Sequence, residues 1–355
     1  MGAISDLKEY KLLIEKELEI YFDKKLDLFK DLDPFTCEML ELIKEYTLRG
    51  GKRIRAALVY YGYLLFKNEN LEEIKKASMS MELTQSYLLM LDDFMDRDDK
   101  RRGGKTAHFF YQLFHTKENL KGDKVHFGNT MATLAGSMCN HFANGILCDI
   151  NLDSERKVAA IKELNRLIPF VIHGQNLDVL EGVRTGISEN IIIQIHKFKT
   201  ATYTFEAPLR IGAILAGASE NQLQILTDFS IPLGIAFQIQ DDILGIYGDE
   251  KKLGKPVGSD LIEGKKTLLV SKVYELGTAE QKQFLKDCLG NKNITEADIE
   301  KVRQIVIDTG SLKYSKDMVA MLVRQAKEHV SRLEANEEAK SFLLGIANYM
   351  VERDY

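Results

Sequence analysis

A helix-type hydrophobic periodicity recurs along almost the whole chain, and it constrains the fold more than any other feature. Near the start, apolar residues recur at Leu12, Ile14, Leu18 and Phe22, and the pattern returns around Ile161. Only 5 prolines interrupt 355 residues, and strand-type alternation bounded by turns is scarce. We therefore predict an all-α protein.

The periodicity places the first helices over residues 1–30, from Asp33-Pro34 to about Leu48, and over residues 71–96. The β-branched run Ile191–Ile193 is assigned to a helix, because Ser188 can cap it and the helical spacing continues. The length allows one large domain or two. We expect residues 1–355 to form a single domain.

Composition excludes several classes of protein. The net charge of −5 gives no reason to expect nucleic-acid binding. Because no apolar run approaches about 18 residues, no membrane span is predicted. The charged, helical start does not resemble a secretory signal. The four cysteines, Cys37, Cys139, Cys148 and Cys288, show no CxxC pairing and are expected to be reduced in a cytoplasmic protein.

The first chemically informative stretch ends an apolar helix with Asp92, Asp93 and Asp96. Helical spacing is expected to place the three carboxylates on one face, where their repulsion is unfavourable unless cations bind. Carboxylate oxygens suit Mg²⁺, which keeps waters and bridges to phosphate oxygens. Arg101 and Arg102 follow, and guanidinium groups bind phosphate in bidentate fashion. The stretch points to a diphosphate substrate; the alternative is a solvated, charged helix end.

A second basic segment precedes this stretch and contains Gly50, Gly51, Lys52 and Arg55. The glycines allow close backbone approach, and Lys52 and Arg55 can converge on one anion near a helix N-terminus. The alternative is a basic surface turn. Gln85 lies two turns before the first aspartate and needs a partner, which is either a ligand or a backbone carbonyl.

The second acidic cluster again ends an apolar helix, with Gln238, Asp241 and Asp242 at helical spacing. A Gly/Lys-rich loop follows, as expected of a lid over phosphates.

Two earlier helices carry polar residues in apolar surroundings. Gln175 and Asp178 either line a cavity or form a local hydrogen-bonded pair, and Lys199 either faces a polar cavity or extends to solvent. The histidines, His196 among them, lack metal-ligand spacing and are interpreted as structural.

An apolar slot below paired acidic helices suits a prenyl diphosphate, and the sequence closely resembles the trans-isoprenyl diphosphate synthases, the polyprenyl synthetase family. The resemblance covers nearly the whole chain. The family's motifs occur in order as GGKRIR (50–55), DDFMD (92–96), RRG (101–103), GQNLD (174–178), KT (199–200), FQIQDD (237–242) and GKPVGSD…GK (254–265). It implies an isoprenoid-synthase-type helical bundle around a central apolar cavity, acting as a homodimer.

The resemblance also implies residue roles. Three Mg²⁺ ions, or Mn²⁺ as an alternative, would be held against the allylic diphosphate by Asp92, Asp96 and Asp242, supported by Asp93 and Asp241. The allylic diphosphate would be clamped by Arg101, Lys199 and Lys255, and isopentenyl diphosphate would be bound by Lys52, Arg55, Gln85 and Arg102. The remaining substrate-site residues would be Thr200 and Gln238 facing the allylic cation, Asp260 and Lys265 ordering the loop, Arg353 closing the homoallylic site, and Gln175, Asp178 and Phe237 within the matched motifs.

The implied reaction is the condensation of isopentenyl diphosphate with dimethylallyl, geranyl or farnesyl diphosphate. One departure from the family's pattern is that Gly245 replaces the third aspartate of the second acidic motif, although many members share this change. Activity is expected to survive, and Asp249 is a candidate to contribute through water.

Product length is expected to depend on side chains below the first aspartate, because growing chains in the family extend along that helix. One helical turn rises about 5 Å, comparable to one isoprene unit. The aromatic Tyr87 five residues before Asp92, with Leu88 after it, resembles archaeal-type geranylgeranyl diphosphate synthases. We predict a twenty-carbon product. The alternatives are a farnesyl diphosphate synthase, a non-catalytic subunit of a heteromeric prenyltransferase, and a terpene cyclase, which would not need an isopentenyl pocket.

Overall fold

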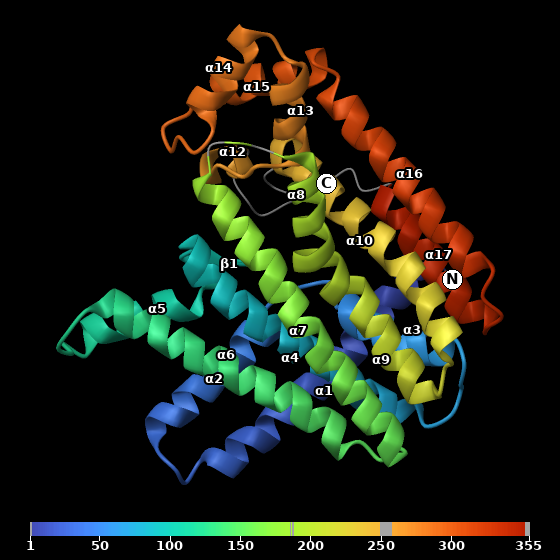
Figure 1. Cartoon of the computed structure of the whole chain (residues 1–355). Helices are drawn as coiled ribbons and strands as arrows, with labels where there is room; N and C mark the ends of the chain where they lie inside the picture. The colour runs from blue at the N-terminus through green and yellow to red at the C-terminus, as the bar shows by residue number, and fades with distance from the viewer. Residues whose placement is uncertain (1, 185, 187, 249–257, 352–355) are drawn as a thin grey trace. The chain divides into compact units, whose positions relative to one another are not determined.

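The computed structural model describes residues 2–184, 186, 188–248 and 258–351 (Figure 1). The described chain is almost entirely helical, which confirms the predicted all-α class. It divides into two compact units, unit 1 with Met1–Lys162 and Ile211–Gly217, and unit 2 with Glu163–Arg210 and Ala218–Tyr355. None of the described helices is both long enough and apolar enough to cross a membrane.

Unit 1 is built from the N-terminal helices. They are α1 (Ala3–Phe29), α2 (Pro34–Leu48), α3 (Ile54–Leu64), α4 (Leu71–Asp96), α5 (Ala107–Lys117), α6 (Lys124–Asp149) and the first part of α7 (Ser154–Val183). The helix α4 packs chiefly along α6 and also along α3. The bounds of α4 coincide with the predicted helix over residues 71–96, so the end of α4 carries the first acidic motif as expected.

The N-terminal helix shows how the periodicity forms the core of unit 1. Its buried stripe consists of Leu7, Tyr10, Ile14, Leu18 and Phe22, at spacings of three and four residues. The hydroxyl of Tyr10 lies 2.7 Å from Ser78 Oγ on α4, which satisfies both buried polar groups. Leu12, which was counted with this stripe from the sequence, is 70% exposed.

A short β-hairpin between α4 and α5 was not predicted. The strands β1 (Lys100–Arg101) and β2 (Gly104–Lys105) pair antiparallel, with Arg101 opposite Gly104. The two turn residues, Arg102 and Gly103, have φ angles of 51° and 80°. Positive φ at both central residues is the geometry that tight hairpins favour. The turn is therefore centred on Arg102-Gly103.

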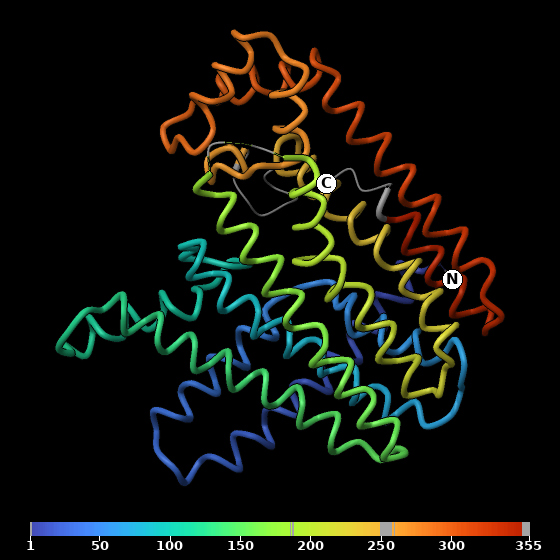
Figure 2. The backbone as a smooth tube through the Cα atoms, viewed as in Figure 1, coloured from blue at the N-terminus to red at the C-terminus, as the bar shows by residue number. Residues whose placement is uncertain are grey.

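Unit 2 is organised around α10 (Glu220–Tyr247), which packs along α16 (Ser311–Ser331) and along η1 (His196–Glu206) (Figure 2). The other helices are α8 (Glu189–Ile195), α12 (Ser259–Glu263), α13 (Leu268–Leu276), α14 (Ala279–Cys288), α15 (Glu296–Asp308) and α17 (Glu337–Val351). The remaining helix, α9 (Ala207–Ala216), is shared with unit 1 as α7 is. The β-branched run Ile191–Ile193 lies in α8, as predicted.

The segment η1 is a π-helix, which periodicity did not predict. It carries Lys199 and Thr200, two of the predicted site residues. Stretches of π-helix are rare and occur frequently at functional sites. The local winding thus marks the same segment that the motif analysis selected.

Candidate active site

The three aspartates of the first acidic motif lie in different surroundings. Asp93 is fully buried, and its carboxylate accepts hydrogen bonds from Tyr46 Oη at 2.6 Å and from Arg101 Nε. Asp92 is half-buried and Asp96 is exposed. The prediction that all three carboxylates share one face is therefore wrong for Asp93, because tertiary partners on α2 and β1 hold it inward.

The buried pair of Asp93 and Arg101 fixes one cation at the end of α4. Burial raises the pKa of Asp93, although the charge of Arg101 and the hydrogen bond from Tyr46 act in the opposite direction. Burial lowers the pKa of Arg101, but the neighbouring Asp93, Tyr46 and Asp92 together outweigh this and raise it overall. The Arg101 Nη2 atom also lies 3.7 Å from carboxylate oxygens of Asp92 and of Asp98. Arg101 therefore stays charged beside the more accessible Asp92.

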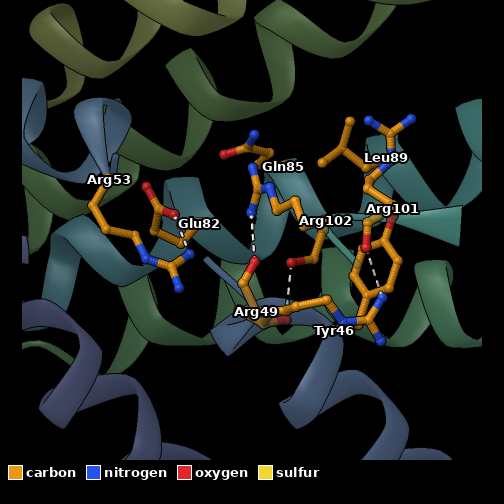
Figure 3. A pocket seen from close by; sticks show the side chains of 10 residues that line it. Tyr46, Arg49, Arg53, Glu82, Gln85, Leu89, Arg101 and Arg102 are labelled. Atoms are coloured by element: carbon orange, nitrogen blue, oxygen red, sulfur yellow. Dashed lines mark hydrogen bonds and ion pairs between the residues drawn. The ribbon is translucent and has the colours of Figure 1, made fainter. Parts of the chain in front are cut away.

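A pocket next to this pair is rich in arginine. Its lining includes four guanidinium groups, those of Arg49, Arg53, Arg101 and Arg102, together with Gln85 (Figure 3). Burial and the charge of Arg53 lower the pKa of Arg102. The cations thus repel one another, and a bound anion would relieve this repulsion. A phosphate fits these groups because guanidinium binds it in bidentate fashion.

Two arginines connect the basic segment to the hairpin. Arg49 Nη1 donates to the carbonyl oxygens of Arg101 at 3.0 Å and of Lys105 at 2.9 Å. Arg102 Nη1 donates back to the carbonyl oxygens of Arg49 at 3.1 Å and of Gly50 at 3.3 Å, and Figure 3 draws the bonds between Arg49, Arg101 and Arg102. These reciprocal bonds position the pocket walls. Arg49 was not predicted as a site residue, although it begins the same RGGKRIR run.

Arg53 is held inside unit 1 by carboxylates. Its side chain pairs with Glu82 at 3.0 Å and with Glu15 at 3.1 Å, and only 2% of the Arg53 and Glu82 side chains is exposed. Glu82 also accepts the backbone N–H of Ala56 at 3.3 Å. Arg53 has a φ of 56°, a left-handed conformation that is uncommon outside glycine. The ion pair thus fixes the turn that leads into α3, on which Lys52 and Arg55 depend.

The predicted isopentenyl site is brought together in part. Gln85 and Arg102 line the arginine-rich pocket, whereas Lys52 and Arg55, although described by the structure, are not among its lining residues. Lys52 is exposed and Arg55 is half-buried. The pocket also contains Glu82, which the sequence did not mark.

The predicted chain-length residues lie on the half-buried part of α4. Tyr87 and Leu88 are both half-buried. Tyr87 packs against α6 at Gly136, where an added Cβ would lie 3.3 Å from Tyr87 Cδ2. Burial raises the pKa of Tyr87. Tyr87 therefore occupies the contact between α4 and α6.

The second acidic motif repeats the division between a buried and a more accessible aspartate. Asp242 is 6% exposed and accepts a hydrogen bond from Gln238 Nε2 at 3.1 Å, and Gln238 in turn accepts one from Thr200 Oγ1 at 3.0 Å. His196 Nε2 lies 3.1 Å from Asp242 Oδ2, without the alignment of a hydrogen bond. Asp241 is half-buried. Asp241, which was assigned only a supporting role, is thus the more accessible of the two.

The π-helix also places Lys199 against α7. Lys199 Nζ lies 2.6 Å from Asp178 Oδ2, so these two motif residues form an ion pair. The close approach depends on Gly174, where an added Cβ would lie 2.3 Å from the backbone nitrogen of Lys199. Gln175, the residue after Gly174, is half-buried. The ring of Phe237 packs edge-on against that of Phe205, with the ring centroids 5.7 Å apart. Asp178 therefore pairs across helices with Lys199.

The carboxylates of the two acidic motifs suit Mg²⁺, with the exception of Asp93. Among the described residues, no three His, Cys, Asp or Glu side chains form a group that could hold a metal. Mg²⁺ is usually held by one or two carboxylates together with water and phosphate oxygens, so it does not require such a group. Asp92 and Asp96 provide such oxygens, and the buried Asp242 Oδ2 has no hydrogen-bond partner. Asp93 does not fit, because both of its oxygens are already hydrogen-bonded.

Some predicted residues add little or lie outside the described structure. Lys265 Nζ lies 3.6 Å from Asp260 Oδ1, which is consistent with the expected pairing in that loop. Lys255, Arg353 and Asp249 lie outside the described residues. His196 and Tyr46 were missed as partners of the aspartates, since they are distant in sequence and match no motif.

Comparisons with known proteins agree with the motif analysis. A family model described as Polyprenyl synthetase matches residues 37–306. The short chain isoprenyl diphosphate synthase of Methanocaldococcus jannaschii is 33% identical over 305 residues, which cover 86% of this chain and 86% of that protein. The geranylgeranyl diphosphate synthase of Saccharolobus solfataricus is 34% identical over 307 residues, which cover 86% and 87%.

A solved structure extends the similarity to the fold. The geranylgeranyl pyrophosphate synthase from Corynebacterium glutamicum, complexed with isoprenyl diphosphate and magnesium, matches with a TM-score of 0.91 at 29% sequence identity. The match covers 98% of this chain and 99% of that chain. The similarity therefore includes both units and almost every element described above.

Proposed function

The chain belongs to the polyprenyl synthetase family, has the helical isoprenoid-synthase fold and is a prenyl-transferring enzyme, and we propose that it joins isopentenyl diphosphate to allylic diphosphates. The condensation is head-to-tail (1'-4), with dimethylallyl, geranyl and farnesyl diphosphate as the allylic substrates. The arginine-rich pocket beside Asp92 is the observation that carries the proposal, because an isopentenyl diphosphate needs a cationic site of its own. A terpene cyclase, which uses one prenyl diphosphate, has no need of it.

The allylic substrate is bound through its diphosphate. Arg101, Lys199 and Lys255 contact this group, so that the charge that develops as it departs meets fixed cations. Asp92, Asp96 and Asp241 are the metal-binding residues best supported by their accessibility, with Asp242 behind Asp241. Mg²⁺, when bound there, supplies Lewis-acid stabilisation of the departing diphosphate.

The chain's own groups then protect and direct the reaction. The Thr200 hydroxyl and the Gln238 amide, hydrogen-bonded to each other at 3.0 Å, face the allylic carbon as its bond to diphosphate oxygen breaks. The isopentenyl double bond attacks this carbon, and a proton is then lost to the released diphosphate, since no side chain in the described part of the chain is an evident general base. Water must be excluded, because it would convert the cation to an alcohol.

The isopentenyl diphosphate occupies the arginine-rich pocket of unit 1. Gln85 and Arg102 line this pocket, and Lys52 and Arg55 approach the same diphosphate from the basic segment. Arg49 and the ion pair of Arg53 with Glu82 line the same pocket and position these groups.

The main product is geranylgeranyl diphosphate. Tyr87, half-buried between α4 and α6, limits the space below Asp92, and Leu88 leaves more room than a second aromatic would. Farnesyl diphosphate is the runner-up or a co-product. The named product of the S. solfataricus relative supports the twenty-carbon assignment.

The decisive experiment supplies labelled isopentenyl diphosphate with dimethylallyl, geranyl or farnesyl diphosphate and Mg²⁺, and then sizes the products. Incorporation of label into a twenty-carbon product is expected. No incorporation with any primer would refute the synthase function and favour a cyclase or a non-catalytic subunit. Residues 1–355 acting as one catalytic domain, the homodimeric state and the cytoplasmic location stay predictions.

A further inference from the structure

A lysine that lies outside the matched motifs is bonded to a helix end far from it in sequence. The ammonium group of Lys266 donates hydrogen bonds to the carbonyl oxygens of Glu181, at 2.5 Å, and of Arg184. A third bond runs to the carbonyl oxygen of Gly186, at 3.2 Å. An ammonium group has three N–H donors, so each of them has a backbone oxygen to bond here.

The three carbonyl groups lie where α7 ends, around Val183. The last four carbonyls of an α-helix have no partner within the helix, and that end carries a partial negative charge. The last turn of α7 contains no basic residue of its own, and Glu181 is buried from water. The ammonium of Lys266 therefore provides the hydrogen bonds and the positive charge that this helix end needs.

The same end of α7 carries one half of the ion pair to the π-helix. Asp178 precedes Glu181 by three residues, a spacing at which helical side chains are neighbours, and its carboxylate lies 2.6 Å from Lys199 Nζ. The Asp178 side chain is 42% exposed, and an ion pair that accessible contributes little stability by itself. Because helix ends fray, the position of this pair depends on how firmly the end of α7 is held.

We propose that the end of α7 is a binding site for an ammonium-type cation, that Lys266 fills this site, and that Lys266 is thereby a positioning residue for Lys199. The inference rests on the proposed function in one respect, the contact of Lys199 with the allylic diphosphate. The preceding lysine has different partners, since Lys265 pairs with Glu263 at 2.8 Å within its own segment. The two adjacent lysines thus have separate roles.

A matched control comes from another lysine of unit 2. Lys282 Nζ donates to the carbonyl oxygen of Glu275 at 3.4 Å, in the last turn of α13. This helix carries none of the predicted site residues. Lys282→Ala therefore removes a lysine from a helix end and leaves α7 unchanged.

The first measurement is steady-state kinetics with Mg²⁺. In Lys266→Ala the KM for geranyl diphosphate should rise by about 10-fold, the scale of a lost hydrogen bond to a charged group. The KM for isopentenyl diphosphate should change little, because its pocket lies in unit 1. Lys282→Ala should leave both values unchanged. Thermal unfolding checks each variant, and Lys266→Met replaces Lys266→Ala in the kinetic comparison if the alanine variant does not fold.

The second measurement supplies the missing cation from solution. Methylammonium has N–H donors and fits the space vacated in Lys266→Ala, so it should lower the KM for geranyl diphosphate again. Tetramethylammonium has the same charge and no N–H donor, so at equal concentration it should have no such effect. A loss of stability alone would not respond differently to the two ions.

Amide hydrogen exchange tests the cation site without any substrate. Exchange over residues 178–183 of α7 should be faster in Lys266→Ala than in Lys282→Ala, and methylammonium should slow it. A KM for geranyl diphosphate equal to that of Lys282→Ala, or equal recovery with the two ions, would overturn the proposal. Faster exchange that methylammonium reverses, in a protein that never incorporates isopentenyl diphosphate, would refute the proposed function and leave the cation site standing.

Discussion

Replacing Glu82 by glutamine tests whether the ion pair with Arg53 holds the pocket in place. Glu82 is 2% exposed, and it accepts hydrogen bonds from Arg53 Nη1 at 3.0 Å and from the Ala56 N–H at 3.3 Å. A glutamine oxygen can keep one of these bonds, but the amide NH₂ group then faces the guanidinium as a second donor. Arg53 is left as a buried charge with less compensation.

The expected loss of stability follows from that burial. Removing one partner of a buried ion pair destabilises a protein by about 3–5 kcal/mol. Glu45→Gln is the matched control, because Glu45 pairs with Arg49 in the same unit but its side chain is 58% exposed. An exposed pair contributes about 0–1 kcal/mol.

Urea unfolding measures both variants. Glu82→Gln should lower the free energy of unfolding by at least about 3 kcal/mol, with the denaturant slope unchanged. Steady-state kinetics should show a raised KM for isopentenyl diphosphate and little change in KM for the allylic substrate, since Arg53 supports the turn between Lys52 and Arg55. A stability loss no larger than that of Glu45→Gln would refute the reasoning.

Three further predictions concern other parts of the molecule. Tyr87→Ser should lengthen the products beyond twenty carbons, as sized by chromatography of labelled lipids; an unchanged product length would contradict the role of Tyr87 as the limit. Asp92→Asn should weaken Mn²⁺ binding with little change in the free energy of unfolding. Asp93→Asn should destabilise the fold by about 3 kcal/mol, because it leaves the buried Arg101 without its carboxylate. Equal effects of the two variants on both measurements would be inconsistent with the different surroundings of the two aspartates. Burial raises the pKa of Glu163, but hydrogen bonds from Arg166 and Arg210 outweigh this effect and lower the pKa below its usual 4.5. The contribution of Glu163 to stability is therefore present above about pH 4.5 and is lost as the pH falls through the lowered pKa. Urea titrations across this range should show a steeper fall for the unmodified protein than for Glu163→Gln, and parallel curves would contradict the assignment.

The helices could be predicted from sequence where one apolar face is buried. The stripe from Leu7 to Phe22 on α1 and the limits of α4 follow directly from periodicity. The π-helix at His196–Glu206 could not be predicted this way, because apolar spacing does not reveal that the hydrogen bonds run from i to i+5. The hairpin was missed because two-residue strands carry no alternation, and only the positive φ angles of Arg102 and Gly103 reveal the turn.

The candidate site was predictable as a set of residues but not as a set of roles. The motifs identified Asp92, Asp93, Asp241 and Asp242, yet nothing in an Asp-Asp pair says which member is buried. That choice is made by partners far along the chain, since Tyr46 lies 47 residues from Asp93. A local sequence pattern cannot contain such information.

The division within each Asp-Asp pair follows from helix geometry. Adjacent residues on a helix point about 100° apart, so two neighbouring aspartates cannot both face the same metal site in the same way. In each unit the more buried aspartate accepts a hydrogen bond from another side chain, which helps to fix the end of its helix. Tyr46 donates to Asp93, and Gln238 donates to Asp242. The other aspartate of each pair, Asp92 or Asp241, is the more accessible one.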